Sequence, residues 1–239
     1  METSINAIVL VGGKFDKGLY RKCINSLSWT NEIIKVKTDD IKGSFADWRN
    51  EGFKEASGDW ILYIDTDEEV SVALMEEIMS VIKKNSGKVG CFAIPRKNII
   101  FGKEFKHGGQ FPDYQKRLFN RSNFSKWTGR LHEEPSYKGF LEHLKNPITH
   151  HKNSSISEMI KKTNKWSELE AEEMIKANHP KMNIFRFFSA GLREFWLRFV
   201  KQLSFLDGVE GIIYAMYQVF SRLISYSKLW EKQLSKTLI

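Results

Sequence analysis

Short apolar runs alternate with segments of helical spacing over the first 95 residues of the chain. The apolar runs predict buried strands at residues 6–11, 32–37, 60–64 and 91–94, the last one ending before Pro95. The periodic segments predict helices at residues 19–27, 45–56 and 71–84. Three successive strand-and-helix units imply a largely parallel sheet, because parallel strands need a crossover connection. The expected fold class is α/β.

The pattern changes twice after this region. Residues 97–144 are rich in glycine, aromatic and basic side chains and have weak periodicity, which is typical of loops and short strands that build a site. Helical spacing returns at residues 155–177, 184–203 and 208–231. We therefore expect an α/β domain at residues 1–154 and a helical C-terminal extension at residues 155–239.

Two carboxylates follow the apolar strand at residues 60–64. Asp65 and Asp67 stand two positions apart at its C-terminal end, where open α/β sheets bind ligands. Such a pair holds Mg²⁺ or Mn²⁺ through oxygen ligands, and the metal neutralises a departing nucleotide diphosphate. Asp67 is the first candidate for a direct ligand, with Asp65 near the ribose or sharing the metal. The alternative is that these acids only favour the start of the helix near Ser71.

Charge and cysteine content narrow the class of protein. The net charge is +8 and the pI is about 9.3, which favours an anionic partner: nucleic acid, a diphosphate ligand or an acidic lipid surface. No nucleic-acid-binding signature accompanies this charge, so no nucleic-acid partner is expected. Cys23 and Cys91 have no metal-ligand spacing, and the N-terminus lacks an export signal, both of which favour the cytoplasm.

Aromatic and basic side chains alternate along the C-terminal helices, as at Phe188, Arg193, Trp196 and Arg198. Such a mixture suits the headgroup region of a membrane. Charged residues interrupt every apolar stretch before it reaches the roughly 18 residues of a spanning helix. We therefore expect peripheral attachment to a membrane surface. The alternative is that the same apolar faces pack against the α/β domain or a second subunit.

Two longer motifs resemble a known family. Residues 56–68, ASGDWILYIDTDE, are similar to the A-x-G-D-W-x-L-x-x-D-A-D-E signature of family-2 glycosyltransferases related to the lipopolysaccharide-core glucosyltransferases. Residues 107–119, HGGQFPDYQKRLF, resemble the H-G-G-x-x-P-D-x-Q-x-R-L-F block of the same group. Shorter similar blocks follow in order at residues 131–133, 146–150, 205–208 and 228–231. The resemblance thus spans nearly the whole chain.

This resemblance implies a GT-A fold, a Rossmann-like and mainly parallel sheet flanked by helices. It also implies a metal-dependent inverting transfer from a nucleotide-sugar, with a UDP-sugar favoured, to a glycan or lipid-linked acceptor. The setting would be cell-envelope polysaccharide or lipopolysaccharide synthesis at the cytoplasmic face of the inner membrane. Asp113, in the second block, is the candidate base that removes the proton of the acceptor hydroxyl. The alternative for Asp113 is a turn aspartate after Pro112.

Further residues are candidates for donor and metal binding. Guanidinium groups match phosphate geometry, so Arg117 is a candidate for contacts to the diphosphate or the acceptor. The alternative for Arg117 is a structural salt bridge. His132 with Glu133, and His150 with His151, are candidates for a third metal ligand or for a phosphate contact. The complete set of donor-binding candidates is Asp39, Arg49, Asn50, Asp65, Gln115 and Arg117, and the metal candidates are Asp67, Asp65 and His132.

The N-terminal loops depart from the family pattern. Residues 12–16 and 38–40 stand where the family usually has a K-N-E-E-like stretch and a D-S-G-S-T-D-like loop near the nucleotide. Asp39 remains in reach of the base or ribose, and Arg49-Asn50 matches the family's R-N pair. Because these loops are altered, an alternative function is that the chain is a degenerate, non-catalytic transferase-like domain that binds a membrane or a partner.

Overall fold

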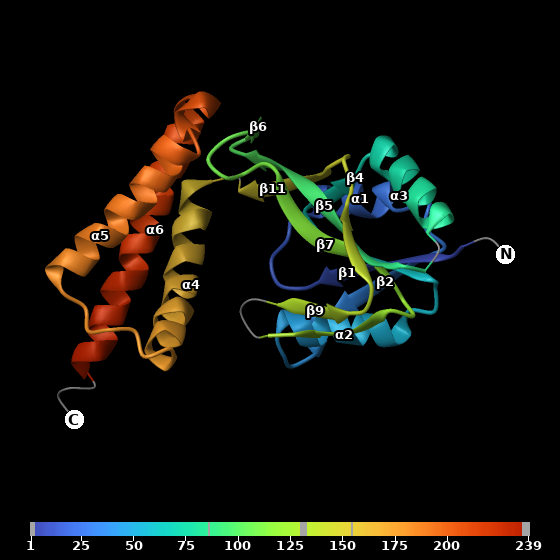
Figure 1. Cartoon of the computed structure of the whole chain (residues 1–239), viewed down its shortest axis with the longest axis horizontal. Helices are drawn as coiled ribbons and strands as arrows, with labels where there is room; N and C mark the ends of the chain where they lie inside the picture. The colour runs from blue at the N-terminus through green and yellow to red at the C-terminus, as the bar shows by residue number, and fades with distance from the viewer. Residues whose placement is uncertain (1–2, 86, 130–132, 154, 236–239) are drawn as a thin grey trace. The chain divides into compact units, whose positions relative to one another are not determined.

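The computed structural model describes residues 3–85, 87–129, 133–153 and 155–235 (Figure 1). The chain divides into two compact units. Unit 1 consists of Met1–Asn98 with Pro112–His151, and unit 2 of Ile99–Phe111 with Lys152–Ile239. The division places residues 99–111 with the C-terminal helices, whereas the sequence pattern predicts one continuous domain over residues 1–154.

Unit 1 is built around a mixed sheet. Its strands are β1 (Ile5–Val11), β2 (Glu32–Lys37), β3 (Trp60–Asp65), β4 (Glu68–Val70), β5 (Val89–Ile100), β7 (Asp113–Asn120), β10 (Phe140–His143) and β11 (Ile148–Asn153). They pair in the order β2-β1-β3-β7-β5-β11-β4, with β10 also paired to β5. β1 is parallel to β2 and β3, whereas β7 is antiparallel to β3 and β5.

The expected parallel pairing is therefore correct for β2, β1 and β3, and for β10 with β5, whereas β7 pairs antiparallel with β3 and β5, and β11 pairs antiparallel with β4. The helices α1 (Lys17–Ser26) and α2 (Phe45–Glu55) connect the three parallel strands. Between residues 89 and 153, the described part of the chain contains strands and loops without a helix. Without a helical crossover, neighbouring strands there pair mostly antiparallel.

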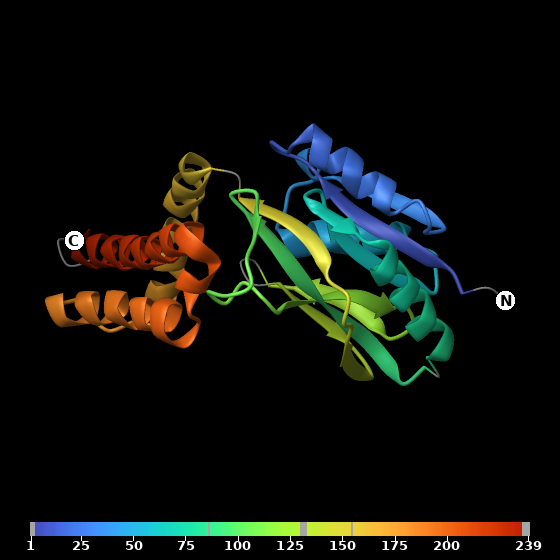
Figure 2. The ribbon, with the colours of Figure 1, turned by 90° about the horizontal axis from the view of Figure 1, so that it is seen from above.

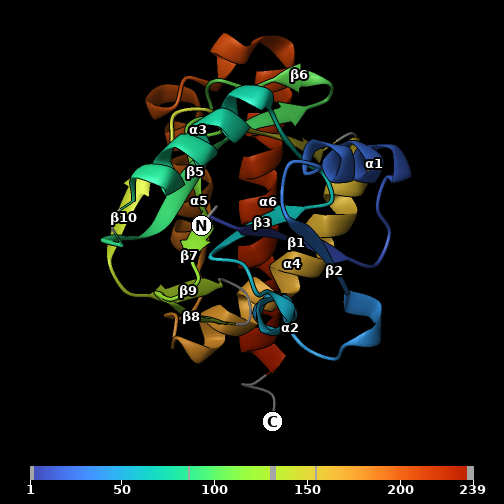
Figure 3. The same cartoon turned by 90° about the vertical axis from the view of Figure 1, so that its right-hand side faces the viewer.

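Both faces of the sheet are covered. α1 and α3 (Val72–Lys84) pack on one face, where Leu62, Leu74 and Ile78 belong to one buried cluster. α2 and the β8–β9 hairpin (Phe124–Thr128 and Glu134–Tyr137) pack on the other face, where Tyr63 and Trp127 belong to a second cluster (Figure 3). Burial on both faces explains why β1 and β3 read as continuous apolar runs.

The helices of unit 1 begin at side-chain caps. The Asp16 carboxylate accepts from the backbone N–H groups of Gly18 and Leu19. Ser44 forms a capping box with Asp47 at the start of α2, and Ser71 caps α3. Such caps satisfy backbone donors that have no partner within the helix. They explain why the predicted helix starts lie within about two residues of the observed ones.

Strand β5 continues past Pro95, where the sequence pattern predicts its end. Pro95 lies opposite Tyr114 in the antiparallel pairing with β7, and the strand runs on to Ile100. Proline lacks only a donor, so a strand tolerates it where the ladder does not need that N–H group. The extension carries Arg96 and Asn98, which both belong to the candidate site described below.

Unit 2 is a helical unit. Its long helices are α4 (Ile156–Lys176), α5 (Ile184–Phe195) and α6 (Gly208–Ser235), and α6 packs against both α4 and α5 (Figure 2). The predicted helix at residues 184–203 continues from α5 as a π-helical turn, Trp196–Lys201. A short 3-10 turn, Ser204–Asp207, precedes α6.

Residues 99–111 are fixed to the helices of unit 2 by Asp207. Its carboxylate accepts from the backbone N–H groups of Lys106 (3.1 Å) and His107 (2.8 Å), and it lies 2.9 Å from His107 Nδ1. Gly108 donates its backbone N–H to Gln202 O at 2.8 Å. A Cβ atom on Gly108 would lie 2.8 Å from Ser204 Oγ, so the approach requires glycine. The H-G-G and F-L-D-G blocks of the sequence therefore meet in unit 2.

Candidate active site

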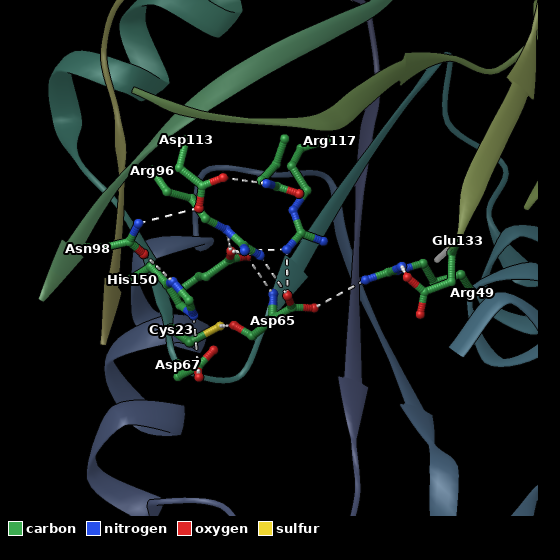
Figure 4. Close-up of polar contacts among 12 residues, drawn as sticks. Cys23, Arg49, Asp65, Asp67, Arg96, Asn98, Asp113, Arg117, Glu133 and His150 are labelled. Atoms are coloured by element: carbon green, nitrogen blue, oxygen red, sulfur yellow. Dashed lines mark hydrogen bonds and ion pairs between the residues drawn. The ribbon is translucent and has the colours of Figure 1, made fainter. Parts of the chain in front are cut away.

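The last residue of β3, Asp65, is surrounded by three guanidinium groups (Figure 4). Arg96 Nη2 lies 3.1 Å from Asp65 Oδ2, and Arg117 Nη2 donates to the same oxygen. Arg49 Nη2 lies 3.7 Å from Oδ1. The arginines come from β5, β7 and α2, and their side chains reach the end of β3. The chain itself thus engages both carboxylate oxygens of Asp65.

Glu68 completes an arginine cluster, which we define as Arg49, Arg96 and Arg117 with Asp65 and Glu68. The Glu68 side chain has no exposed surface. Its Oε1 lies 2.6 Å from Arg96 Nη2 and 3.0 Å from Arg117 Nη2. Its Oε2 accepts from the backbone N–H of Asp65 at 2.9 Å. Buried charges of this kind persist only when paired, so the cluster fixes the turn between β3 and β4.

Opposing influences set the pKa values in this cluster. Burial acts to raise the pKa of Asp65, but the charges of Arg117, Arg49 and Arg96 outweigh burial and hold that pKa well below its usual range. Burial acts to lower the pKa of Arg117, but Asp65 and Glu68 outweigh burial and raise it. Asp65 is therefore ionised and Arg117 protonated at every physiological pH.

Asp67 has a different environment from Asp65. It lies in the turn after β3, its side chain is 39% exposed, and His150 Nε2 lies 3.7 Å from its Oδ2. His150 Nδ1 lies 2.7 Å from Asn98 Oδ1. Because an amide oxygen only accepts hydrogen bonds, Nδ1 carries a proton, and in the neutral ring Nε2 presents its lone pair beside Asp67.

Asn98 links this pair to Asp113. It is fully buried, and its Nδ2 donates to Asp113 Oδ2 at 3.3 Å. Gln115 Nε2 donates to the other oxygen, Asp113 Oδ1, at 2.7 Å. We refer to the connected residues Asp67, His150, Asn98 and Asp113 as the polar chain (Figure 4). It joins a candidate metal ligand to the candidate base.

The groups at Asp67 fit a divalent metal. An exposed carboxylate and an imidazole nitrogen are both ligands for Mn²⁺, and Mg²⁺ commonly uses one or two carboxylates together with substrate phosphates. Asp65, the other expected ligand, has its oxygens engaged by arginines. The described residues contain no cluster of three or more groups of the metal-binding types. His132, the expected third ligand, lies outside them. Asp67 and His150 would therefore hold a metal together with oxygens of the donor.

The loops after β1 and β2 meet at Asp39. Its carboxylate accepts from the backbone N–H of Gly13, with Oδ1 at 2.9 Å. A Cβ atom on Gly12 would overlap Thr38 Oγ1, so this approach requires glycine. Both loops follow the carboxyl ends of parallel strands, where the nucleotide was expected. The structure thus brings Asp39 to the predicted edge of the sheet.

Arg49 and Asn50, adjacent on α2, contact different groups. Arg49 lies over the Trp127 ring, 4.7 Å from its centroid, and 3.5 Å from Glu133 Oε2. Asn50 exchanges two hydrogen bonds with the backbone of Trp127, at 2.8 and 3.0 Å. The amide of Asn50, which the motif suggested for donor binding, thus anchors strand β8.

Three residues of the site are absent from the candidates drawn from sequence: Glu68, Arg96 and Asn98. Arg96 and Asn98 stand two positions apart in β5, so their side chains point to the same face of the sheet. The sequence pattern did not reveal this, because it predicts that the strand ends before Pro95. The signal for Glu68 was its place in the D-x-D-E motif. Only the fold shows that its carboxylate is buried between two guanidinium groups.

The sequence matches a protein-family model. The model is described as Glycosyl transferase family 2, and it matches residues 21–165. An uncharacterized glycosyltransferase of Rickettsia conorii is 26% identical over 195 residues, 76% of this chain and 68% of that protein. One from Rickettsia bellii is 26% identical over 189 residues, 74% of this chain and 63% of that protein.

Solved structures share a weaker likeness. A crystal structure of S. aureus TarS has a TM-score of 0.40 and 10% identity, covering 92% of this chain and 49% of that chain. A shorter TarS fragment in complex with UDP-GlcNAc has a TM-score of 0.42 and 9% identity, covering 98% of this chain and 92% of that chain. With TM-scores below 0.5, these structures support no conclusion beyond the family match.

Proposed function

The chain belongs to glycosyl transferase family 2 and is a glycosyltransferase, and we propose that unit 1 carries out a metal-dependent, inverting transfer from a nucleotide-sugar. The acceptor in this proposal is a glycan or a lipid-linked glycan of the cell envelope, with lipopolysaccharide as the first case to test. A UDP-sugar is the first donor to test. Mg²⁺ or Mn²⁺ would bind at Asp67 and His150 and offset the negative charge of the departing diphosphate.

The observation that carries this proposal is the polar chain. Asp113 sits at one end of it and the exposed Asp67 at the other, joined through Asn98 and His150. A transfer enzyme needs a base for the acceptor and a charged anchor for the donor, held at a fixed separation. Buried Asn98 supplies that fixed link, because it bonds to Asp113 on one side and to His150, the neighbour of Asp67, on the other.

Asp113 has the geometry of an oriented base. Asn98 and Gln115 each donate to one of its carboxylate oxygens, which fixes the plane of the group. The acceptor hydroxyl gives its proton to Asp113 while its oxygen forms a bond to the anomeric carbon. The bond from that carbon to the diphosphate oxygen breaks, and the nucleoside diphosphate leaves with the electron pair. Attack opposite the leaving group inverts the configuration.

A screen of nucleotide-sugars tests the donor half of the proposal. Each would be added with Mn²⁺, with Mg²⁺ or with a chelator, and thermal stabilisation and slow donor hydrolysis would be measured. We expect one nucleotide class to stabilise the protein only when a divalent metal is present. Equal stabilisation in the presence of chelator would remove metal from the proposal.

We also propose that unit 2 binds the cytoplasmic face of the inner membrane. Large apolar side chains are exposed along α5, at Ile184, Phe185, Phe188, Leu192 and Phe195, and along α6, at Ile212, Ile213, Met216 and Phe220. Exposed Arg186 and Arg193 lie on α5, Lys201 on the π-helical turn that follows it, and Arg222 on α6. Apolar insertion combined with basic side chains suits an anionic leaflet. None of the described helices is long and apolar enough to cross a bilayer.

Sedimentation with anionic vesicles tests the membrane proposal. Phe185, Phe188 and Leu192 share one face of α5 and are 81%, 60% and 67% exposed. Changing all three to serine should abolish vesicle binding without lowering the melting temperature, because they bury little surface in the fold. The matched control changes Val72 and Met79, exposed on α3, to serine. Full-length protein that ignores vesicles at both low and high salt would rule the proposal out.

A further inference from the structure

Unit 2 contains a cavity of about 310 Å³ where the start of α5 lies beside α6. The two helices pack side by side (Figure 2). The volume equals roughly ten waters at about 30 Å³ each. It reaches the lower end of the range for small-molecule sites, about 300 Å³. The described wall of the cavity consists of Met182, Asn183, Ile184, Phe187, Ser227 and Trp230.

The wall of this cavity favours an apolar occupant. None of its described residues carries a charge, and four of the six are large apolar side chains. The two polar side chains are already engaged within the chain. Asn183 Oδ1 accepts from the backbone N–H of Arg186 at 2.9 Å, and Ser227 Oγ donates to Leu223 O at 2.9 Å. Because a buried water needs two to four polar partners, the cavity suits hydrocarbon better than water.

The segment that precedes α5 is fixed against α6 by Gln233. Gln233 Oε1 accepts from the backbone N–H of Met182 at 2.8 Å. Its Nε2 donates to His179 O at 3.2 Å and to Pro180 O at 3.3 Å. These hydrogen bonds hold Met182 in the wall of the cavity. A site whose wall is already held in place costs little ordering when a ligand binds.

The cavity continues into the exposed apolar surface of unit 2. Ile184 on α5 and Trp230 on α6 both line the cavity, and they are 61% and 52% exposed. Phe185 and Phe188, which belong to the proposed membrane contact, are exposed on the same helix as Ile184. Tryptophan is also typical of positions where one side is apolar and the other wet. A bilayer that contacts α5 would therefore bring hydrocarbon chains to the opening of the cavity.

We infer that this cavity takes up one hydrocarbon chain of a bilayer lipid, which lies against Phe187 and Trp230. The inference rests on the proposed membrane contact of unit 2, because that contact supplies the chain. Nearby charges do not select a headgroup, since Lys181 and Arg186 adjoin lining residues in the sequence and so does Glu231. The ligand class is therefore defined by its chain, whose burial is favourable for each methylene removed from water.

A series of alkyl phosphates tests the cavity without a membrane. The full chain would be titrated with butyl, hexyl, octyl and decyl phosphate, each below the concentration at which it forms micelles. We expect affinity to rise about fourfold for each methylene that enters the cavity, and to level off once the cavity is filled. Affinity that does not depend on chain length would overturn the inference.

Two serine variants make this test specific to the cavity. Ser227→Phe places a ring from α6 in the cavity, so at least two methylenes lose their place and decyl phosphate affinity should fall about tenfold or more. Its melting temperature should not fall, because the ring fills apolar space. Ser189→Phe is the matched control at an exposed position on α5 outside the described wall, and affinity should be unchanged. Equal losses in the two variants would contradict binding in the cavity.

Trp230 reports where the chain lies. Bromine quenches tryptophan fluorescence on contact, so decyl phosphate with a terminal bromine should quench wild type more than Trp230→Phe. Vesicles of phosphatidylglycerol with brominated acyl chains should give the same difference, and this arm tests the bilayer as the source of the chain. Quenching that Trp230→Phe leaves unchanged would place the chain elsewhere and overturn the inference, even if Ser227→Phe does not fold.

The outcomes separate this inference from the membrane proposal. The variant with serine at Phe185, Phe188 and Leu192 should lose vesicle binding but keep its affinity for decyl phosphate. Wild-type protein that binds vesicles but no alkyl phosphate overturns the inference and leaves the membrane proposal standing. Protein that binds decyl phosphate but ignores vesicles would take a soluble ligand, which overturns the assignment to a bilayer lipid. A dimer that decyl phosphate dissociates would show that a second copy covers the cavity, and it would also overturn the inference.

Discussion

The arginine cluster around Asp65 and the polar chain that begins at Asp67 differ in almost every respect, although the two aspartates stand two residues apart. Asp65 is enclosed by three guanidinium groups and tied to buried Glu68. Asp67 is 39% exposed, and His150 is the one basic side chain within 4 Å of its carboxylate among the described residues. One region has its charges satisfied by the protein, and the other leaves a carboxylate open to a ligand.

The difference shows that a D-x-D motif need not supply two equivalent ligands. Asp65 ends β3 where arginine side chains from α2, β5 and β7 reach its carboxylate. Asp67 lies two residues later, in the turn after β3. There the backbone N–H of His151 donates to Asp67 O, and the Asp67 side chain remains accessible. We therefore assign a mainly structural role to the first aspartate and a ligand role to the second.

The largest expected effect is at the far end of the polar chain. Asp113→Asn should lower turnover by about 10²- to 10⁴-fold, the range for loss of a general base. The amide keeps the size of the side chain but can accept only one of the two hydrogen bonds from Asn98 and Gln115, so donor affinity should stay near wild type and the melting temperature should fall slightly. Single-turnover kinetics beside nucleotide titration would measure both. Near-normal turnover would remove Asp113 from this role and leave the polar chain without a catalytic end.

A charge change inside the arginine cluster should act on stability. Glu68→Gln leaves Arg96 and Arg117 with one carboxylate fewer in a buried position, which should cost about 3–5 kcal/mol of unfolding free energy. Urea denaturation would measure the loss. The matched control is Glu76→Gln on the exposed side of α3, expected within about 0.5 kcal/mol of wild type. Equal stability of the two variants would contradict a structural role for the cluster.

The two aspartates should respond in opposite ways to substitution. Asp67→Ala should weaken Mn²⁺-dependent nucleotide binding by about 100-fold or more and leave the melting temperature unchanged, because its side chain is an exposed ligand. Asp65→Asn should lower the melting temperature, because it removes the partner of three guanidinium groups. Nucleotide titration with and without Mn²⁺, run beside thermal melts, compares the pair. Unchanged Mn²⁺-dependent affinity in Asp67→Ala would end its assignment as a ligand.

Asn98 should act on the metal through His150. Asn98→Ala removes the acceptor of the Nδ1 proton, so the ring is no longer fixed with Nε2 toward Asp67. Loss of such an orienting partner typically costs about 10- to 100-fold in metal affinity. The Mn²⁺ concentration for half-maximal nucleotide binding should rise by that factor. A variant that only melts earlier, with the same Mn²⁺ dependence, would show that Asn98 is structural.

The smallest effect is a pH dependence of stability at Asp65. Its pKa is depressed in the folded protein, because the three arginines outweigh burial. The stabilisation is therefore complete above the unfolded pKa of about 3.9 and is lost as the pH falls further, toward the folded pKa. Between pH 5 and 2, unfolding free energy should fall more steeply in wild type than in Asp65→Asn. Parallel curves would show that the cluster does not control acid stability.

Much of the site could be predicted from local sequence. The strand at residues 60–65 and the position of Asp65 and Asp67 at its end followed from the apolar run and the acids after it. Asp113 and Gln115 followed from the second motif, and they are hydrogen-bonded to each other. Asn50 was predicted beside the donor, but its amide anchors β8. A motif identifies which residue belongs to a site, but it does not show which groups that residue contacts in the fold.

The sequence by itself determined the positions of β1, β2, β3 and of the three helices of unit 1, and the family of the chain, because apolar periodicity, caps and motifs are all local along the chain. The tertiary structure alone decided that β5 runs past Pro95, and so that Arg96 reaches Asp65 and Asn98 reaches His150. It alone placed residues 99–111 with the C-terminal helices, through hydrogen bonds to Asp207 about 100 residues away. Those contacts depend on which strands become neighbours. That choice is settled by burial of both sheet faces and by pairing of buried charges over the whole fold, which no short window of sequence contains.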